Sequence, residues 1–219
     1  FHRPKYEILI RLKTNDDHII MPDVFIPIAE RYNLIYEIDK WVIRKSFAFF
    51  AEATRKGYLD KDVIFSINIS ADSFFSNDLV EFIAENRKRL NVPAHNFCFE
   101  ITESCAVRNL EATSKFVSEL RKQGFSFSLD DFGKGFSSFP YLKTLPIDYE
   151  KIDGTFIKSI DKDYIDFSMV KTMRDMCYHL GLYTIGEYAE DEQIVAILKD
   201  IGIDYGQGYA FGKPIPIAD

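Results

Sequence analysis

The sequence has few of the residues that build disulfide frameworks and zinc sites, and it has no long apolar run. Its 219 residues include three cysteines and four histidines. The cysteines, Cys98, Cys105 and Cys177, are odd in number and form no CxxC pair, which indicates reduced intracellular thiols. The histidines show no metal-ligand spacing, and no apolar stretch is long enough to cross a bilayer. A disulfide scaffold, a zinc site and a membrane span are therefore excluded within this sequence.

Positive charge is also in deficit. Lysine and arginine number 27 against 34 aspartate and glutamate, a formal net charge of −7. A surface that binds duplex DNA or RNA normally carries a basic patch, so we expect no nucleic-acid duplex as a partner. An acidic protein can still bind phosphate groups where metal ions reverse the local charge.

Hydrophobic residues make up 47% of the chain, enough for a sizeable core in one large domain. Strand and helix patterns alternate throughout, which is typical of a parallel α/β sheet, closed into a barrel or left open. The strands are expected at residues 5–12, 63–69, 97–102, 125–129, 149–153, 183–188 and 205–209. The helices are expected at residues 23–32, 36–56, 78–90, 110–123, 163–180 and 191–201, with a short helical piece at 141–145. A common α/β barrel has eight strands, so we expect the first strand to lie upstream of Phe1. The chain starts at Phe1 and not at Met, and we therefore interpret it as a fragment.

The stretch from Phe125 to Ser138 organises the rest of the chain. A short buried strand is followed by two adjacent carboxylates, Asp130 and Asp131, and then by a turn around Gly133 and Gly135. Two neighbouring carboxylates repel each other, and a buried strand end does not favour them without a cation. This arrangement predicts a metal ion.

Polar residues recur within or at the ends of the other predicted strands. With the aspartate pair they are Glu7, Asn68, Glu100, Asp130, Asp131, Lys151, Glu187 and Gln207. The carboxyl ends of barrel strands meet on one face, where active sites are built. Oxygen ligands without His or Cys favour Mg²⁺ or Mn²⁺, and paired carboxylates can serve two metals in a phosphoryl displacement. A buried Lys151 beside them could hold the attacking water.

Each of these residues also has an ordinary interpretation. Asn68 alone is more often a strand-end cap, and Lys151 with Asp153 an ion pair. Gln207 between two glycines is an ordinary turn, and Glu103 and Glu190 could be exposed or contact a ligand only indirectly. The functional interpretation depends on the coincidence that acids and amides occur at nearly every strand end.

The motifs resemble those of the EAL-domain phosphodiesterases of bacterial cyclic di-GMP signalling, over essentially the whole chain. In family order, they are Glu7-Ile8-Leu9 with Arg11, Asn68-Ile69-Ser70, FEITES at 99–104, DDFG at 130–133, Lys151-Ile152-Asp153, Glu187 to Glu190, and the closing motif at 207–214.

The resemblance implies a modified TIM (β/α)₈ barrel whose first strand runs antiparallel and is missing here. Residues 1–219 would form a single EAL domain, truncated at its N-terminus and part of a longer signalling protein. It implies hydrolysis of cyclic di-GMP to linear pGpG with Mg²⁺ or Mn²⁺, and inhibition by Ca²⁺. It also implies a homodimer through the loop after Asp131 and a neighbouring helix, and an upstream sensory or GGDEF domain. The domain would be cytoplasmic, with any membrane anchor in segments outside this sequence.

The resemblance also implies roles for individual residues. The first metal would be held by Glu7, Asn68, Glu100 and Asp130, and the second by Asp130, Asp131 and Glu187. The catalytic set would be Lys151, which orients the nucleophilic water, with Glu187, Gln207 and Glu103. Glu103 would brace the loop after Asp131. Cyclic di-GMP would contact Arg11, the Leu9 backbone, Asp153 and Glu190.

The sequence departs from the family pattern at four positions. Ile8 replaces alanine, Lys134 a threonine, Phe136 a tyrosine, and Tyr188 the glycine after Glu187. The changes at 134 and 188 leave open a cyclic di-GMP receptor that binds without cleaving. A scaffold that binds neither nucleotide nor metal is disfavoured, because burying so many unpaired acids costs several kcal/mol.

Overall fold

The computed structural model describes residues 3–74, 76, 78–134 and 139–217. The chain divides into two compact units. The N-terminal unit comprises Arg3–Ile101 and Glu111–Ser126, and the C-terminal unit comprises Thr102–Leu110 and the described residues after Ser126.

Three parallel strands form the sheet of the N-terminal unit. They are β1 (Lys5–Ile8), β4 (Ile64–Asn68) and β5 (Phe97–Thr102). β4 pairs with both of the others, and the register sets Asn68 opposite Glu100. Because parallel strands end at the same edge, this register brings two predicted site residues to one edge of the sheet.

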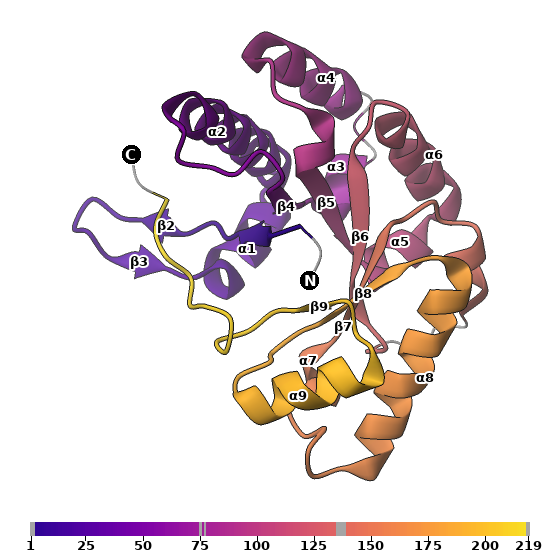
Figure 1. Ribbon diagram of the computed structural model, residues 1–219. Coiled ribbons are helices and arrows are strands. Elements are labelled where there is room, and N and C mark those ends of the chain that lie inside the picture. Colours follow the sequence, from indigo (N-terminus) through magenta and orange to yellow (C-terminus); the bar gives the residue numbers. More distant parts are fainter. Residues whose placement is uncertain (1–2, 75, 77, 135–138, 218–219) are drawn as a thin grey trace. The chain divides into compact units, whose positions relative to one another are not determined.

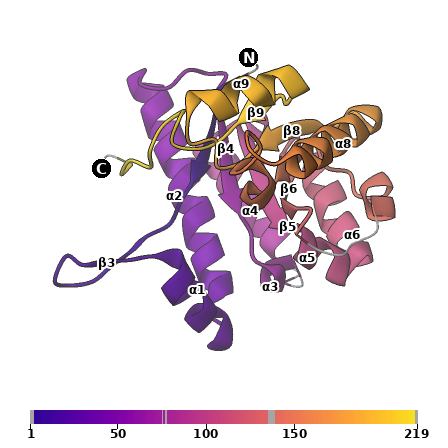
Figure 2. The same cartoon turned by 90° about the horizontal axis from the view of Figure 1, so that it is seen from below.

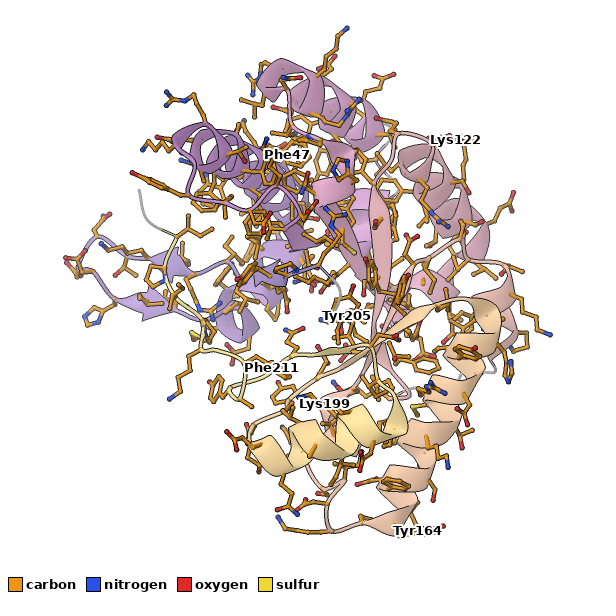
Figure 3. All side chains as sticks on the ribbon, in the orientation of Figure 1. Phe47, Lys122, Tyr164, Lys199, Tyr205 and Phe211 are labelled. Carbon is orange, nitrogen blue, oxygen red and sulfur yellow. The ribbon has the colours of Figure 1, made fainter. Side chains whose placement is uncertain are left out.

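Helices cover this sheet, with α2 against both β4 and α4 (Figure 1). The helical segments are α1 (Pro22–Arg31), α2 (Ile35–Lys56), α3 (Ala71–Phe74), α4 (Leu79–Leu90), the 3₁₀ turn η1 (Ala94–Asn96) and α6 (Leu110–Arg121). α2 ends at Gly57 and α4 at Asn91, both in the left-handed conformation that closes helices. Phe47 of α2, labelled in Figure 3, is fully buried, and its ring lies 4.5 Å from that of Phe97.

The predicted strand over residues 5–12 is too long. It ends at Ile8, whose partner Ile67 is one residue before the end of β4. Leu12–Lys13 (β2) instead pairs antiparallel with Ile19–Ile20 (β3), and this hairpin extends beyond α1 in Figure 2.

Four parallel strands form the sheet of the C-terminal unit, in the order β6, β7, β8, β9. Their bounds are Ser126–Phe132, Tyr149–Ile152, Tyr183–Gly186 and Tyr205–Gly206. With the three of the N-terminal unit, the described residues therefore contain the seven parallel strands that the sequence predicts.

The helical segments of this unit are α5 (Glu103–Arg108), η2 (Phe139–Lys143), α7 (Gly154–Ile157), α8 (Tyr164–Leu180) and α9 (Glu192–Ile201). An aspartate caps the N-terminus of each of the last three: Asp153, Asp163 and Asp191 accept hydrogen bonds from backbone N–H groups of the first turn. α8 packs against β7, β8 and α9. No helix of the described residues is long and apolar enough to span a membrane.

Two strand ends differ from the prediction where site residues lie. β6 continues to Phe132, which pairs with Ile152 after a register irregularity, so Asp130 and Asp131 lie within the strand. β8 ends at Gly186, two residues before Tyr188, which has a left-handed φ of 54°. The predicted turn residue Gly135 and the substituted Phe136 lie outside the described residues.

Candidate functional site

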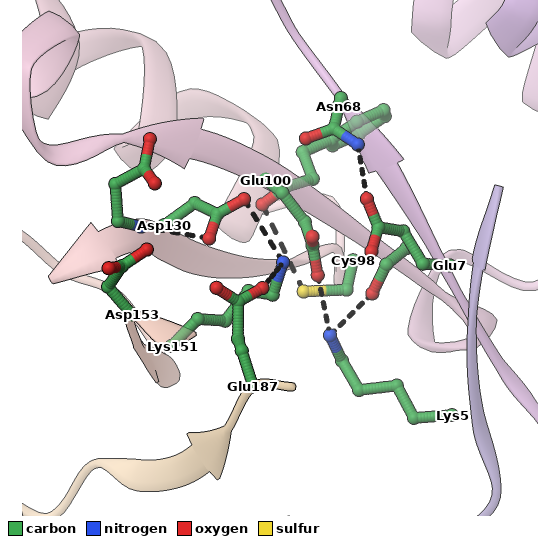
Figure 4. Close-up of polar contacts among 12 residues, drawn as sticks. Lys5, Glu7, Asn68, Cys98, Glu100, Asp130, Lys151, Asp153 and Glu187 are labelled. Atoms are coloured by element: carbon green, nitrogen blue, oxygen red, sulfur yellow. Dashed lines mark hydrogen bonds and ion pairs between the residues drawn. The ribbon is translucent and has the colours of Figure 1, made fainter. Parts of the chain in front are cut away.

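In the N-terminal unit, three predicted metal ligands lie on adjacent strands (Figure 4). The Asn68 side-chain amide donates a hydrogen bond of 2.7 Å to Glu7 Oε1. Glu100 is almost fully buried, and Lys5 Nζ pairs with its Oε1 at 2.8 Å. A buried carboxylate is destabilising unless a cation or several donors compensate it, and the lysine supplies that compensation.

Lys5 is a site residue that the sequence interpretation missed. It lies two residues before Glu7, so both side chains point to the same face of β1. That spacing was the available signal, but a lysine in a strand is usually a solvated residue.

The predicted nucleotide contacts of the N-terminal unit lie just after β1. Leu9 is exposed, and Arg11 Nη1 donates to the Ile10 carbonyl at 2.8 Å. This contact is local, and the guanidinium retains further donors for a phosphate or a base.

A buried carboxylate also supports the turn that follows Asn68. Asp39 of α2 accepts three hydrogen bonds at one oxygen: from the Ser70 backbone N–H at 2.9 Å, and from the Ser70 and Ser73 hydroxyls at 2.6 Å each. Burial raises the pKa of Asp39, and the serine hydrogen bonds oppose that rise. Asp39 therefore ties α2 to the segment between β4 and α3. The sequence interpretation missed this role, because an aspartate in an amphipathic helix is usually exposed.

In the C-terminal unit, Lys151 lies between two predicted metal ligands. Its Nζ is 3.0 Å from Asp130 Oδ2 and 2.9 Å from Glu187 Oε1, and its side chain is 1% exposed. These residues come from β6, from β7 and from the position after β8, and they converge as the strand-end argument predicts. A buried ammonium persists only with such compensation, so the three groups form one electrostatic unit.

Asp131 belongs to a second ion-pair cluster of the same unit. Lys134 Nζ is 2.6 Å from Asp131 Oδ1 and 2.9 Å from Asp153 Oδ2. These two carboxylates raise the pKa of Lys134. Burial acts to raise the pKa of Asp153, but hydrogen bonds from Thr155 and Lys134 outweigh it and leave that pKa lowered. Lys151 and Asp153, the ion pair of the ordinary interpretation, thus each pair with other residues.

Glu103 contacts the turn that follows Asp131. Its Oε2 accepts a hydrogen bond of 3.2 Å from the Gly133 backbone N–H, and its Oε1 accepts one of 2.7 Å from the Tyr141 hydroxyl. Burial, and then the hydrogen bond to Glu103, raise the pKa of Tyr141, so the hydroxyl keeps its proton and remains a donor.

Glu150 is a fully buried acid that the sequence interpretation also missed. Neither of its carboxyl oxygens has a hydrogen-bond partner among the described residues. Burial, followed by the charges of Glu103 and Asp130, raises its pKa well above the ordinary value of 4.5. It neighbours Lys151 on β7, and strand alternation sends the two side chains to opposite faces.

The backbone holds Gln207 beside the segment that carries Glu187. The Gln207 N–H donates to the Gly186 carbonyl at 2.8 Å, and its carbonyl accepts from Ala189 at 2.9 Å. Glu190, the other predicted contact of this segment, is exposed.

The ring of Tyr188, the residue after Glu187, packs against the start of α7. A Cβ atom built on Gly154 would lie 2.1 Å from the ring, and Lys158 Nζ is 4.0 Å from the ring centroid. Glu187 meanwhile pairs with Lys151, so neighbouring residues have separate partners.

The donor chemistry fits Mg²⁺ or Mn²⁺, because carboxylate and amide oxygens are the ligands these ions prefer. No group of three or more His, Cys, Asp and Glu side chains within the described part of the chain is arranged as a metal cage. Lysine ammonium groups instead compensate Glu100, Asp130, Asp131 and Glu187. A divalent ion could take the place of the lysine ammonium beside each of these carboxylates, since both compensate the same negative charge.

A family model described as the EAL domain matches residues 2–214. The chain is similar to the cyclic di-GMP phosphodiesterase PdeB of Shewanella oneidensis, at 42% identity over 99% of this chain and 25% of that protein. It is also similar to the cyclic di-GMP phosphodiesterase PdeA of Borreliella burgdorferi, at 37% identity over 98% of this chain and 32% of that protein. The chain thus spans between a quarter and a third of the length of these two relatives.

Solved structures agree with the family match. The PaMucR phosphodiesterase in complex with c-di-GMP superimposes with a TM-score of 0.89 at 31% identity, over 96% of this chain and 84% of that one. The FimX EAL domain of Pseudomonas aeruginosa, at 23% identity and a TM-score of 0.90 over 98% of this chain and 85% of that one, has the same fold. The TIM-barrel-like α/β class predicted from the sequence is confirmed, whereas the antiparallel first strand stays a prediction.

Proposed function

Because the chain belongs to the EAL domain family, we propose that it is a metal-dependent phosphodiesterase that hydrolyses cyclic di-GMP to linear pGpG. The observation that carries this proposal is Lys151, a buried ammonium held between Asp130 and Glu187. Three buried charged groups are not needed for stability alone, because well-packed apolar residues in place of all three stabilise a core as well or better.

We assign the metal ligands by motif. Glu7, Asn68, Glu100 and Asp130 would hold one Mg²⁺ or Mn²⁺ ion, and Asp130, Asp131 and Glu187 the other. When bound, such a pair stabilises the charge that develops on the attacking and leaving oxygens of a phosphodiester. We further propose that Ca²⁺ inhibits, because its longer bonds and flexible coordination do not suit this reaction.

The protein's own groups would bind and orient the reactants. Lys151 donates to the attacking water and offsets the charge of Asp130 and Glu187. Gln207 assists through a water molecule, and Glu103 braces the turn after Asp131 through Gly133. The nucleotide would contact Arg11, the Leu9 backbone, Asp153 and Glu190.

The test is incubation of the purified chain with cyclic di-GMP and Mn²⁺, with products separated by chromatography. We expect pGpG, and no product when EDTA replaces Mn²⁺. A folded sample that gives no pGpG at high protein concentration with either Mn²⁺ or Mg²⁺ would overturn the proposal.

Two observations favour a receptor that binds cyclic di-GMP without cleaving it. Tyr188 has a strained left-handed backbone directly after Glu187, and Lys134 already pairs with Asp131. Calorimetry that shows tight binding of cyclic di-GMP, in a sample that yields no pGpG, would select this alternative.

We also propose the setting of the domain. Residues 1–219 would form one EAL domain of a longer cytoplasmic signalling protein with an upstream sensory or GGDEF domain, in line with the small share of its relatives that the chain covers. A homodimer would form through the loop after Asp131 and a neighbouring helix. Sedimentation analysis checks the dimer, and a single monomeric species at micromolar concentration would contradict it.

A further inference from the structure

A tight turn folds the chain back just after Asp131. Asp131 itself has a left-handed φ of 62°, and Gly133 follows with a φ of 94°. The Lys134 N–H donates to the Asp131 carbonyl at 3.2 Å, which closes the turn. This geometry returns the Lys134 side chain to the Asp131 carboxylate three residues earlier.

The Lys134 ammonium has two partners of different character. Asp131 is 40% exposed, whereas Asp153 is 4% exposed and uses its other oxygen to cap α7 through the Thr155 N–H. The Asp153 contact is therefore anchored in the fold, and the Asp131 contact is the more accessible of the two. A lysine ammonium is charged throughout the physiological pH range, and here it lies within ion-pair distance of both carboxylates.

We propose that Lys134 is a built-in cation that competes with the second divalent ion for Asp131 and so sets the metal concentration that the enzyme requires. This inference rests on the proposed function, which assigns Asp131 to that ion. An arriving metal ion must displace the ammonium and then remain close to its charge. The Lys134 ammonium can keep its ion pair with Asp153 after a metal ion has displaced it from Asp131, so it remains paired.

The size of the effect follows from exposure. The pair of Lys134 with Asp131 is about half exposed and therefore partly screened by solvent. Removing the ammonium should tighten metal binding by about tenfold and not by several orders of magnitude. A larger factor would require a dry site, which the exposure of Asp131 excludes.

The experiment is a titration of the purified chain with Mn²⁺ in the absence of nucleotide, with unbound Mn²⁺ measured by electron paramagnetic resonance. Lys134→Thr and Lys134→Met should each bind the second Mn²⁺ ion, the one assigned to Asp131, about tenfold more tightly than the original chain does. Lys171→Met removes the same charge from an exposed position on α8 and should change nothing. The Mn²⁺ concentration for half-maximal hydrolysis should fall in parallel in the two Lys134 variants.

The outcomes separate the two proposals. Equal or weaker Mn²⁺ binding by both Lys134 variants, in a chain that binds Mn²⁺, would overturn this inference and leave the proposed function standing. Absence of Mn²⁺ binding by the original chain and by every variant would overturn both.

Discussion

At the scale of single residues, Lys151 combines full burial with a full charge. Its ammonium is stable in the interior because Asp130 and Glu187 are 3.0 and 2.9 Å away. Removing one partner of a buried pair leaves uncompensated charge, which typically costs 3–5 kcal/mol. We therefore expect Lys151→Met to lower the free energy of unfolding of the metal-free protein by about 3 kcal/mol.

The same variant tests the catalytic role. We expect Lys151→Met to lose at least about 10²-fold in the rate of pGpG formation, because the attacking water loses its orienting donor. Lys171→Met is the matched control for the loss of one positive charge. A Lys151→Met protein that is folded with Mn²⁺ and nearly as active as the original chain would show that Lys151 is structural only.

The burial of Glu150 predicts how the stability of the protein depends on pH. Its pKa is raised well above 4.5 in the folded protein, so the carboxyl group keeps its proton to a higher pH there than in the unfolded chain. The unfolded state thus releases a proton that the folded state retains, and stability falls as pH rises from 4.5 toward the raised folded-state pKa. A single such group changes the free energy of unfolding by about 1.4 kcal/mol per pH unit in that window.

Glu150→Gln removes this titration and keeps the shape of the side chain. The difference in stability between the variant and the original chain should grow in favour of the variant as the pH rises above 4.5. Urea unfolding of the metal-free proteins measures it. Parallel stability curves would contradict a raised pKa of Glu150 in the folded protein.

The site residues at strand ends were predictable because strand periodicity and residue type are local. Lys151, Asp130 and Glu187 needed only the rule that parallel strands end on one edge. The sequence interpretation missed three residues, Lys5, Asp39 and Glu150, because their roles depend on burial or on partners distant in the sequence, which no local pattern encodes. Lys134 was visible as a departure from the family, but its ion pairs depend on the left-handed turn at Asp131.

At the scale of elements, Asp39 joins α2 to the segment that leaves β4. It accepts three hydrogen bonds from Ser70 and Ser73. Removing the carboxylate therefore leaves the Ser70 N–H and the two serine hydroxyls without this acceptor. We expect Asp39→Ala to lower the free energy of unfolding by about 2–4 kcal/mol, and Ser73→Ala by about 1 kcal/mol. Chemical denaturation measures the free energy of unfolding of both variants. If Asp39→Ala lowered it by no more than Ser73→Ala does, the central role of Asp39 in this cluster would be contradicted.

Element bounds were predicted well where caps mark them. Gly57, Gly181 and Gly202 ended α2, α8 and α9 at the expected residues, since glycine adopts the left-handed closing conformation most easily. The β2–β3 hairpin and the short helices α3, α5 and α7 were missed. They contain too few residues to show a hydrophobic period.

At the scale of the whole molecule, metal binding should be coupled to stability. A ligand that binds only the folded state stabilises it by an amount that grows with concentration, about 2.7 kcal/mol at a hundred times its dissociation constant. We expect Mn²⁺ to raise the unfolding temperature of the chain, and EDTA to reverse the rise. An unfolding temperature that does not change with saturating Mn²⁺ would contradict the assignment of these acids as metal ligands.

The contact between Tyr188 and Gly154 links two positions that are 34 residues apart in the chain. The ring fills the space that a methyl group on residue 154 would need. Natural relatives with an aromatic residue at the first position should therefore keep glycine at the second, and those with glycine at the first should accept larger residues at the second. Evolution would have to change the two together, and either single replacement would pass through a poorly packed intermediate.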